Sequence, residues 1–458
     1  MEKKTFKRGI RLPERKHATE GTAVVSIPVP KQVVIPVNQH FGAPNQAIVQ
    51  AGDYVKRGQK IADAVKPGSL AVPVHASIAG TVKKIEVRTQ SNNSDGPCII
   101  IETAEGDAAM GDKDFLPPLD PFACSKEEAL ERIREAGIVG MGGAGFPTHV
   151  KLNPPPEKPI DIIIADGAEC EPYLTTDEAA MTARTAALIR GLSIVMKISS
   201  VENAVIGMED NKERLISLIK KAIEESSHSG NISVQLCRTL YPQGGEKMLI
   251  TALTGREVPS GGLPMDAGCI VQNVGTLIAI ADAFDEGKPL IKRGLTVSGG
   301  ACGNPKNILA PIGALLSELP EDFFSIDHSR LRKILFGGPM MGTAVPSLAI
   351  PIQKNTSGVI LMTAEESGEY DEGPCIRCGR CLMNCACRLS PALMNFALEE
   401  GDLDASVKAG LMDCIECGGC TYICPARIKL VQRFRVGKQR LRLQQAAERA
   451  ASQQAADK

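Results

Sequence analysis

A pair of cysteine runs near the C-terminus constrains this sequence more than any other feature. The first run is Cys375-x2-Cys378-x2-Cys381-x3-Cys385, and the second is Cys414-x2-Cys417-x2-Cys420-x3-Cys424, which Pro425 follows. Each run places three thiols in one tight loop and a fourth a few residues further on. Such a loop encloses a cubane iron–sulfur cluster better than it surrounds a small tetrahedral ion. The runs therefore predict two [4Fe–4S] clusters and a chain that carries electrons.

When two such clusters share a domain, the fourth cysteine of each run binds the cluster of the other run. We therefore predict one ligand set made of Cys375, Cys378, Cys381 and Cys424, and a second made of Cys414, Cys417, Cys420 and Cys385. The alternative is a pair of structural zinc sites, which normally use two separated Cys-x2-Cys pairs. Duplication of the complete run favours clusters. The first run has Ala386 where a proline usually follows, and Cys387 adds a thiol that could replace Cys385.

The composition narrows the function and the compartment. With 458 residues the chain is long enough for three or four domains. Its 52 Lys and Arg nearly balance 53 Asp and Glu, and tryptophan is absent, so neither charge nor base stacking indicates a nucleic acid partner. Clustered cysteines, and an N-terminus without the apolar core of a signal peptide, favour a reducing compartment. No apolar run approaches the ~20 residues of a membrane-spanning helix, so we expect a protein that is soluble by itself.

The N-terminal third has the pattern of a β-rich domain. Val24–Val37 is a Val/Ile-rich stretch interrupted by prolines, and short strands separated by Gly turns follow it. Gly52–Ile61 and His75–Val82 resemble the two halves of the barrel-sandwich hybrid of lipoyl and biotinyl carrier domains. Carriers have a lysine at the hairpin tip between the halves. Here the tip is Pro67-Gly68-Ser69 with Lys66 only nearby, so we predict a structural module without a lipoyl or biotinyl group.

The middle of the chain has an alternating pattern. Residues 106–121 are rich in Gly, Asp and Pro and predict a linker, after which Ser125 and Glu128 form a capping-box pattern at the start of a helix. Strands are then expected at Ile160–Ala165, Ala204–Gly207 and Ile232–Leu236, and helices at Asp177–Met196, Lys212–Glu225, Gly245–Leu253 and Gly275–Phe284. This alternation predicts an α/β domain with a largely parallel sheet.

The last third changes character twice. From Pro289 to Met362, Val/Ile/Leu strands, Gly-Gly pairs and one short helix near Ile312–Leu319 predict a small β-grasp-like domain. After the cysteine runs, Arg427–Arg442 carries seven Lys and Arg and no acid, which predicts a solvated helix face, and we expect the Gln/Ala-rich end to be disordered. The predicted domains are residues 1–120 (barrel-sandwich hybrid and linker), 121–285 (α/β), 286–364 (β-grasp-like), 365–430 (helical two-cluster ferredoxin-like) and 431–458 (basic helix and tail).

The glycine-rich segment Gly140-Met141-Gly142-Gly143-Ala144-Gly145 matches the G-x-G-x-x-G pattern of dinucleotide-binding loops. That pattern needs a strand before the glycines and a helix after them, whereas here a helix precedes and Phe146-Pro147-Thr148 follows. We therefore predict a flexible backbone whose N–H groups can approach phosphates or a flat ring, and no Rossmann loop. Lys151, further on, is a candidate phosphate partner.

Three further segments of the same domain have the residues of a ligand site. Asp166–Tyr173 follows a predicted strand, which is where α/β folds place ligand groups. Tyr241–Lys247 and Gln272–Thr276 each open a predicted helix, whose N-terminus favours anions. Each segment alone also fits ordinary turn or capping chemistry. Four such loops beside two clusters predict a redox cofactor site.

These four segments resemble the flavin and NADH site of the flavoprotein subunit of respiratory complex I. The whole chain is more similar still to the C subunits of the Rnf ion-translocating oxidoreductases. The resemblance rests on Tyr241–Lys247, Gly255–Pro264 and Gly337–Gly342, together with the carrier-like domain and the doubled cysteine run. It extends from about Phe6 to Val431.

The resemblance implies a bound FMN with NADH stacked against it. The residues that it assigns to FMN are Gly140, Gly142, Gly143, Gly145, Lys151, Asp166, Glu169, Glu246, Asn273 and Thr276. It places Glu171 and Tyr241 along the nicotinamide side. Asp166 stands where the family usually has asparagine, and an added carboxylate there is unfavourable unless it is protonated or paired.

The resemblance also implies a function. It predicts an NADH-oxidising subunit that moves electrons between NAD(H) and ferredoxin through FMN and two [4Fe–4S] clusters. Membrane subunits of the complex would hold it peripherally on the cytoplasmic face of the bacterial plasma membrane, where Na⁺ or H⁺ is moved. Two alternatives stay open: a soluble relative that serves a cobalamin-dependent or other reductase partner, and a non-enzymatic electron carrier or scaffold, which Asp166 keeps in consideration.

Overall fold

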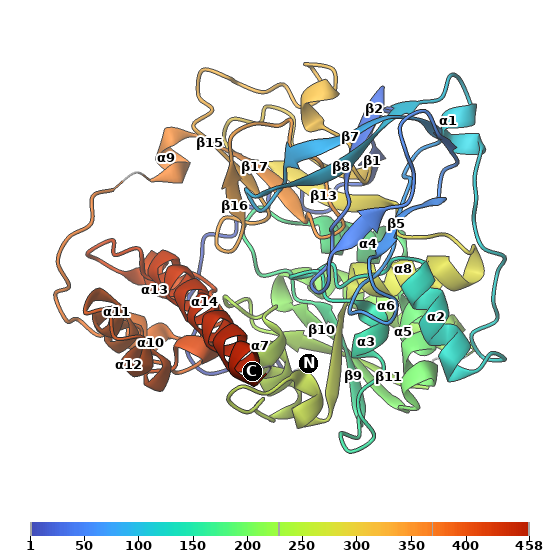
Figure 1. Cartoon of the computed structure of the whole chain (residues 1–458). Coiled ribbons are helices and arrows are strands. Elements are labelled where there is room, and N and C mark those ends of the chain that lie inside the picture. Colours follow the sequence, from blue (N-terminus) through green and yellow to red (C-terminus); the bar gives the residue numbers. More distant parts are fainter. Residues whose placement is uncertain (1, 228–229, 369, 457–458) are drawn as a thin grey trace.

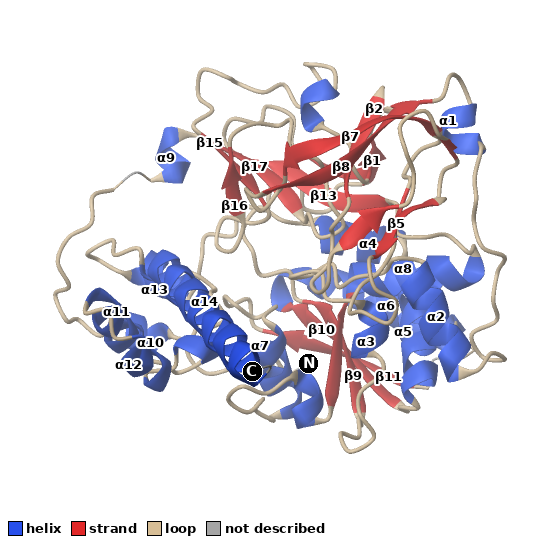
Figure 2. Ribbon diagram, in the orientation of Figure 1, coloured by secondary structure: helices blue, strands red, loops and turns tan. Residues whose placement is uncertain are grey.

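The computed structural model describes residues 2–227, 230–368 and 370–456. Within these residues the chain forms four sheets and a helical C-terminal part, which Figure 1 shows in sequence colours. Two small sheets come from the N-terminal third, a sheet flanked by helices comes from the middle of the chain, and a six-stranded sheet follows it. The C-terminal helices from Arg380 onward lie beside α7 (Glu246–Thr254), away from the six-stranded sheet (Figures 1 and 2).

The two N-terminal sheets are antiparallel and share one apolar core. Their orders are β2-β8-β7-β4 and β3-β5-β6. Side chains from both sheets, among them Val33, Ile61 and Ile99, are fully buried in that core. The strands are β2 (Gln32–Pro36), β3 (Asn45–Ala47), β4 (Tyr54–Val55), β5 (Lys60–Ala64), β6 (Val74–His75), β7 (Gly80–Thr89) and β8 (Asp95–Thr103). Pro67 and Gly68 of the expected hairpin tip are exposed and Ser69 is half-buried, and the predicted linker contains the short helix α1 (Ala108–Gly111).

The Val/Ile-rich stretch at 24–37 is divided between two sheets. β1 (Val24–Ser26) pairs in parallel with β14 (Lys306–Pro311) of the six-stranded sheet, whereas β2 pairs with β8. Pro28 and Pro30 lie between the two strands, and proline has no N–H to continue a ladder. The residues that precede Ile27 therefore run outside the two N-terminal sheets.

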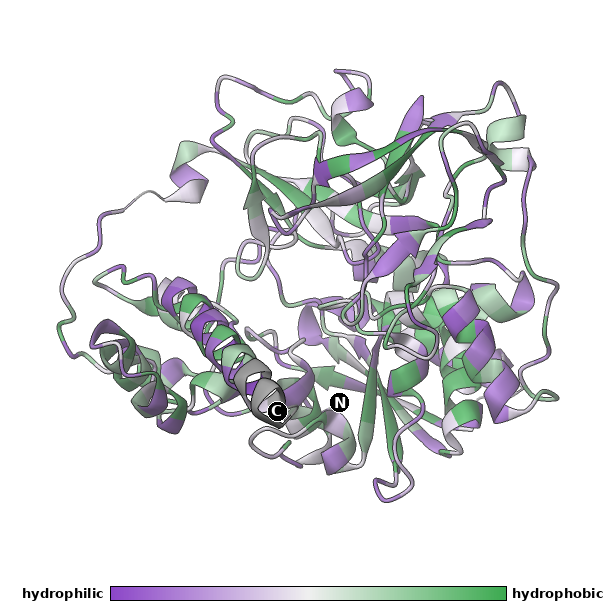
Figure 3. Cartoon of the chain, in the orientation of Figure 1, coloured by the Kyte–Doolittle hydropathy of each residue, from purple (hydrophilic) through white to green (hydrophobic). Residues whose placement is uncertain are grey.

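The middle of the chain forms the predicted parallel sheet, in the order β11-β10-β9-β12. Three strands confirm the sequence prediction, and β12 was missed because this short buried strand directly precedes a helix. The strands are β9 (Ile162–Gly167), β10 (Asn203–Glu209), β11 (Asn231–Cys237) and β12 (Cys269–Asn273). The helices are α2 (Lys126–Glu135), α3 (Thr148–Lys151), α4 (Thr176–Ala183), α5 (Thr185–Ser199), α6 (Ile216–Glu225), α7 and α8 (Val274–Asp285). Figure 3 shows the parallel strands as hydrophobic and α2 as largely hydrophilic.

The predicted helix 177–196 is wrong as a single element. It is broken at Arg184 into α4 and α5, whose axes differ by 93°. α4 packs against β1 and β13 (Lys292–Ser298) of the six-stranded sheet as well as against α8, whereas α5 packs against α8 and, among the described residues, has no such contact with that sheet. The two halves share only part of their neighbours, so one continuous apolar pattern conceals the turn. The helix predicted at 212–225 begins as a 3₁₀ turn at Asp210–Leu215 and becomes α6.

The six-stranded sheet is mixed, in the order β1-β14-β13-β17-β15-β16. β13 pairs in parallel with β17, and antiparallel with β14. The helix expected near 312–319 is reduced to a 3₁₀ turn at Leu316–Glu318, because Gly313 has a φ of +90° and its carbonyl accepts the Val34 N–H of β2. The remaining strands are β15 (Lys333–Phe336), β16 (Thr343–Val345) and β17 (Gly358–Met362).

The C-terminal part is helical. Its helices are α9 (Ala364–Ser367), α10 (Arg380–Asn384), α11 (Pro391–Glu399), α12 (Leu403–Lys408), α13 (Gly419–Ile423) and α14 (Leu430–Ala456). The expectation of a disordered end is wrong as far as Ala456, because the Gln, Ala and Arg residues there favour helix and extend α14. Leu411 and Phe434 are fully buried in a small core beneath the cysteine runs.

Among the described residues, no single helix is both long and apolar enough to cross a membrane. The pair formed by α4 and α5 meets the requirement only when its two bent halves are taken together.

Candidate functional site

The glycine segment 140–145 lies against the N-terminus of α8. The N–H of Met141 donates to Thr276 Oγ1 over 3.0 Å, and a Cβ on Gly142 would lie 3.1 Å from the Cβ of Asn273. Gly145 has a φ of +72°, which a residue with a side chain adopts only with strain. A Cβ on Gly143 would meet no atom within 4 Å. The glycine loop and α8 thus form one surface, and Gly143 faces open space there.

Asn273 connects this surface to the loop after β9. Its Oδ1 accepts the N–H of Gly275 at 2.9 Å and so caps α8. Its Nδ2 donates to Asp177 Oδ2 at 2.8 Å, and the N–H of Asp177 donates to Glu169 Oε1 at 2.9 Å. The predicted residues Asn273 and Glu169 are therefore held together through Asp177, which the sequence did not single out.

The carboxyl groups of this loop have unusual acidities. Burial, and next the nearby carboxylate of Asp177, raise the pKa of Asp166 well above its ordinary value. Burial raises the pKa of Glu169 to about 7, although the positive charge of Lys16 opposes the shift. Asp166 Oδ1 accepts the N–H of Ala168 at 3.0 Å, and Glu169 Oε2 is buried without a hydrogen-bond partner. A protonated Asp166 can both donate and accept, as an asparagine does.

Lys151 and Glu246 lie opposite each other and form an ion pair. Lys151 is the last residue of α3, and Glu246 is the first residue of α7. Both side chains are partly exposed, at 25% and 38%. This pair adds two more predicted residues to the same site.

Glu171 lies at the edge of the site, bound by the segment Gly337–Gly342. Its carboxylate accepts the N–H groups of Met340 at 3.0 Å and Met341 at 2.9 Å. A Cβ on Gly338 would lie 2.3 Å from Glu171 Oε2, so a side chain there would displace the carboxylate. Burial raises the pKa of Glu171 to about 7, while the two N–H donors oppose the shift. The six-stranded sheet thereby fixes a residue of the parallel-sheet domain.

Tyr241 joins the site to the cysteine runs. The residue is 3% exposed, and its hydroxyl donates to the carbonyl oxygen of Cys417 over 2.7 Å. The peptide bond between Tyr241 and Pro242 is cis. The predicted nicotinamide-side role of Tyr241 stays a prediction. What the geometry gives is a direct contact between the segment that opens α7 and the second cysteine loop.

The cysteines of the two runs line two separate cavities. One cavity is lined by Cys375, Cys378, Cys381 and Cys424, and the other by Cys385, Cys387, Cys414, Cys417 and Cys420. Each cavity thus takes three thiols from one run and at least one from the other run. Among the residues that the structure describes, no three His, Cys, Asp or Glu side chains are placed to hold a single metal ion. Ligation of clusters by these thiols stays a prediction.

Several thiols of the cavity that includes Cys414 are harder to ionise than a free cysteine. Burial raises the pKa of Cys417 to about 11 and that of Cys387 to about 12. Burial also raises the pKa of Cys414, against the opposing N–H of Glu416. Metal ligation requires thiolates, and bound iron supplies the positive charge that releases the protons. The donor set of the cavity that includes Cys414 therefore fits an iron–sulfur cluster.

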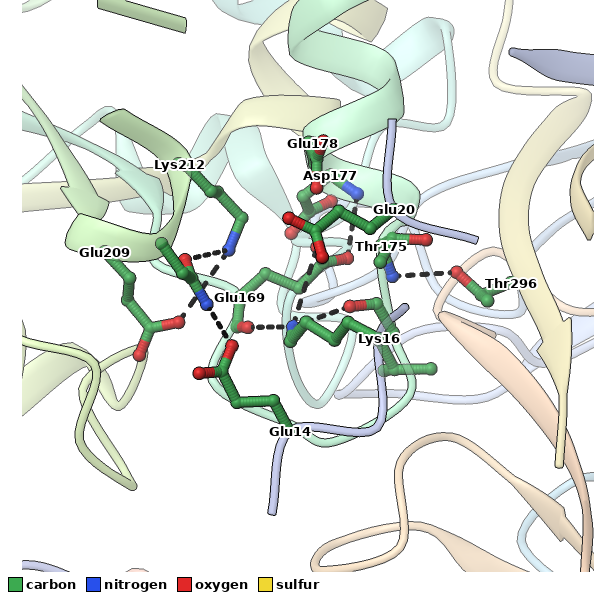
Figure 4. Close-up of polar contacts among 12 residues, drawn as sticks. Glu14, Lys16, Glu20, Glu169, Thr175, Asp177, Glu178, Glu209, Lys212 and Thr296 are labelled. Atoms are coloured by element: carbon green, nitrogen blue, oxygen red, sulfur yellow. Dashed lines mark hydrogen bonds and ion pairs between the residues drawn. The ribbon is translucent and has the colours of Figure 1, made fainter. Parts of the chain in front are cut away.

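Buried cations behind the site were missed in the sequence. Arg293 of β13 is 4% exposed; its Nη2 donates to the carbonyl of Met141 at 3.1 Å and its Nε to that of Thr356 at 2.7 Å. Lys16 and Lys212 lie among the carboxylates drawn in Figure 4. The three residues come from segments far apart in the sequence, and no local pattern around them indicates burial.

Comparison with known protein families agrees with this arrangement. Residues 4–106 match the RnfC barrel-sandwich hybrid domain, and residues 133–282 match the Nuo51 FMN-binding domain. These matches confirm the predicted N-terminal module and the complex I-like α/β domain. A chain of an NAD⁺-reducing [NiFe]-hydrogenase crystal structure is 20% identical over 68% of this chain and 62% of that chain, with a TM-score of 0.48, and is too distant to support an assignment.

Curated relatives match over nearly the whole chain, and three of them are C subunits of ion-translocating oxidoreductase complexes. The relative from the proton-translocating ferredoxin:NAD⁺ oxidoreductase complex of Clostridium ljungdahlii is 44% identical over 437 residues, which are 94% of this chain and 93% of that one. The relative from the Na⁺-translocating complex of Acetobacterium woodii is 40% identical over 95% of this chain and 97% of its own length. The relative from Pseudomonas aeruginosa is 38% identical over 96% of this chain and 56% of its own length. The chain belongs to the family of C subunits of the Rnf ion-translocating ferredoxin:NAD⁺ oxidoreductase complexes.

Proposed function

We propose that this protein is the NADH-oxidising, electron-transferring subunit of an Rnf complex, working between NAD(H) and ferredoxin through FMN and two [4Fe–4S] clusters. The observation that carries the proposal is the hydrogen bond from Tyr241 to the carbonyl of Cys417. Through this contact, the α/β domain that matches an FMN-binding family touches the loop of one predicted cluster. Electron transfer is efficient only between redox centres that lie close together, and this contact would bring the flavin domain close to the cluster loop.

The residues fit an FMN. The glycine loop leaves open space at Gly143, the start of α8 offers N–H groups, and Lys151 provides a cation for a phosphate. Burial raises the pKa of the Asp166 carboxyl and so favours its protonated form, which would present an uncharged group like that of asparagine. FMN supplies hydride acceptance and one-electron release when bound. The protein binds and orients it, and Glu169 and Asp177 fix the neighbouring loop.

The two thiol-lined cavities support a helical two-cluster ferredoxin-like domain at residues 365–430. The thiol sets proposed for the clusters are Cys375, Cys378, Cys381 and Cys424, and Cys414, Cys417, Cys420 and Cys385. The parallel pairing of β13 with β17 within a mixed sheet supports a β-grasp-like domain at 286–364. We assign Cys387 as a half-buried neighbour of the second set.

The two clusters would have different positions in the electron path. The cavity that includes Cys385 is also lined by Tyr241 and Ile10, so its cluster is the inner one, beside the α/β domain. The lining of the cavity that includes Cys375 contains exposed residues, among them Cys378 and Ile376, the latter 65% exposed. This outer cluster would exchange electrons with the partners.

The names of the relatives support a place in a membrane-bound complex. The relatives in Clostridium ljungdahlii and Acetobacterium woodii are subunits of proton- and Na⁺-translocating complexes. By the same role, this chain would bind membrane subunits of its complex on the cytoplasmic face of the plasma membrane, with ferredoxin reached through the complex. The basic helix α14 is a candidate contact surface.

The test is an anaerobic titration with NADH of the full chain, with its clusters reconstituted and FMN added. We expect bleaching that exceeds the two electrons that flavin alone accepts, because electrons pass on to the clusters. If NADH bleaches nothing while dithionite still reduces the clusters, the flavin site is not functional in this chain. The non-enzymatic electron carrier would then be the better description.

A further inference from the structure

The N-terminal strap, residues 4–26, connects parts of the molecule that are far apart in the sequence. The N–H of Lys4 donates to the carbonyl of Leu236 in β11 at 2.8 Å. Further along, the N–H of Gly9 donates to the carbonyl of Asn384, next to Cys385, at 3.2 Å, and Ile10 exchanges two hydrogen bonds with Tyr241, each of 2.9 Å. The strap therefore touches the predicted inner cluster before it reaches the predicted flavin site.

Lys16 is the residue through which the strap holds the loop after β9. The residue is 5% exposed, and its Nζ donates to the carbonyls of Glu169 and Leu174, each at 2.6 Å. Both carbonyls belong to residues 168–175, the loop that joins β9 to α4. The strap holds this loop at a third point, because the N–H of Tyr173 donates to the carbonyl of Glu14 at 2.8 Å. One segment from outside the parallel-sheet domain thus fixes both ends of the loop.

Lys16 also supplies a positive charge beside the Glu169 carboxylate. Its Nζ lies 4.0 Å from Glu169 Oε2, the buried oxygen that has no hydrogen-bond partner. Figure 4 shows the Lys16 ammonium amid these contacts, with Asp177 on the far side of Glu169. A buried carboxylate without a cation nearby is costly and takes up a proton instead. Lys16 therefore acts on Glu169 twice, through its main chain and through its charge.

We propose that Lys16 is a positioning residue of the FMN pocket: it fixes the main chain of Glu169 and balances the carboxylate that would lie beside the cofactor. The inference rests on the proposed function, since Glu169 belongs to the predicted FMN set. It adds a residue from outside 133–282, the segment that matches the FMN-binding domain. The flavin domain then depends on the N-terminal strap for the shape of its own pocket.

Lys212 is a matched control within the same buried group. It is 1% exposed, and its Nζ lies 3.7 Å from Glu209 Oε2 and 3.4 Å from Asn211 Oδ1. Among the described contacts of its ammonium, no hydrogen bond reaches residues 168–175. Replacing either lysine by methionine removes a buried charge from a side chain of similar length. Only Lys16→Met also removes two hydrogen bonds from the loop.

The experiment compares the full-length wild type with Lys16→Met and Lys212→Met. Hydrogen–deuterium exchange of peptides that cover 168–175 reports the loop, and quenching of FMN fluorescence reports affinity. For Lys16→Met we expect exchange about tenfold faster in that loop and FMN binding about tenfold weaker, which are the losses expected from hydrogen bonds of a charged donor. For Lys212→Met we expect a lower melting temperature, with loop exchange and FMN affinity within about twofold of wild type.

Two conservative variants distinguish the positioning role of Lys16 from a general contribution to the stability of the fold. Lys16→Arg keeps the charge and the donors, so FMN affinity should return to within about threefold of wild type. Lys16→Gln keeps hydrogen-bond donors but removes the charge, so we expect a loop that stays protected from exchange and weaker FMN binding. If Lys16→Met does not fold, Lys16→Gln takes its place in the comparison. Equal loop exchange and equal FMN affinity in the Lys16 and Lys212 variants would overturn the proposal. A wild type that binds no FMN would overturn the proposed function, while the exchange data still decide whether Lys16 holds the loop.

Discussion

Asp166 shows how a residue can depart from the pattern of its family without removing the site. A charged carboxylate would be unfavourable beside a phosphate or a reduced flavin. Asp166 is instead partly buried, and the carboxylates of Asp177 and Glu246 add negative charge nearby. Both effects raise its pKa well above the ordinary value. The neutral acid keeps an acceptor for the N–H of Ala168 and gains a donor. A protonated Asp166 thus offers a hydrogen-bond donor and an acceptor, as an asparagine does.

The substitution Asp166→Asn tests this account. The folded chain holds this proton more tightly than the unfolded chain does, so the raised pKa lowers stability as the pH rises above the ordinary value of 3.8. We expect Asp166→Asn to be more stable than wild type at pH 7, with the difference shrinking toward pH 4 in urea titrations. FMN affinity should stay within about threefold, since the raised pKa favours the neutral acid in the wild type. A large gain in affinity would mean that Asp166 is charged in the wild type.

Lys354, whose amine contacts the carbonyl of Gly137 just before the glycine segment, gives a second pH-dependent prediction. Its fully buried amine donates to the carbonyls of Pro73 at 2.9 Å and Gly137 at 2.7 Å, and burial lowers its pKa from 10.5 to about 7. Between these values the unfolded chain binds a proton that the folded chain lacks, so this residue makes stability rise with pH, by at most about 1.4 kcal/mol per pH unit. Lys354→Met should remove that slope. Urea midpoints at pH 7 and pH 9 measure it, and an unchanged slope would contradict the prediction.

At the scale of elements, the sequence predicted what local chemistry determines. Ser125 and Glu128 form the predicted capping box, with Glu128 N–H to Ser125 Oγ at 3.2 Å and Ser125 N–H to Glu128 Oε2 at 2.8 Å. The break at Arg184 and the strand β12 were not predictable in this way, because each depends on which neighbour the segment packs against. The same limit applies to the site. Its glycines and carboxylates lie in recognisable loops, whereas Lys16 and Arg293 arrive from distant segments.

Gly143 gives a prediction at the scale of the glycine loop. A Cβ there meets no atom within 4 Å, and the φ angle of Gly143 is not positive, so the fold itself does not require glycine. Gly143→Ala should therefore change the free energy of unfolding by less than about 0.5 kcal/mol. FMN should bind about tenfold more weakly, because the methyl group would occupy the space of the cofactor. Gly111→Ala is the control, because Gly111 also faces open space without a positive φ but lies outside the predicted site. Equal FMN affinity in both variants would exclude Gly143 from the pocket.

At the scale of the whole molecule, contacts between distant segments determine how the redox parts are joined. The strap contacts β11, the segment before Cys385 and the loop after β9 in turn. Gly337–Gly342 of the six-stranded sheet holds Glu171 of the parallel-sheet domain. The predicted flavin pocket is therefore assembled from three parts of the chain, so we do not expect residues 133–282 alone to reproduce it.

The crossed arrangement of the cysteine runs is the largest-scale feature that mutation can test. Cys424 lines the cavity of Cys375, Cys378 and Cys381, whereas Cys385 lines the cavity of the second run. If each cavity holds one cluster, Cys378→Ser with Cys424→Ser damages the same cluster twice and leaves about four of eight irons per chain. Cys378→Ser with Cys385→Ser damages both clusters and leaves almost none.

Iron and sulfide analysis of the reconstituted chains, together with low-temperature EPR of the reduced state, measures this difference. The control is Cys387→Ser, which should keep all of about eight irons if Cys385 is the ligand. Uncrossed ligation would reverse the two double variants, since Cys378 and Cys385 would then belong to one cluster. A loss of iron in Cys387→Ser, with none in Cys385→Ser, would instead exchange these two residues. In either case the pairing follows from comparing double variants, because a single substitution shows only that one cluster is lost.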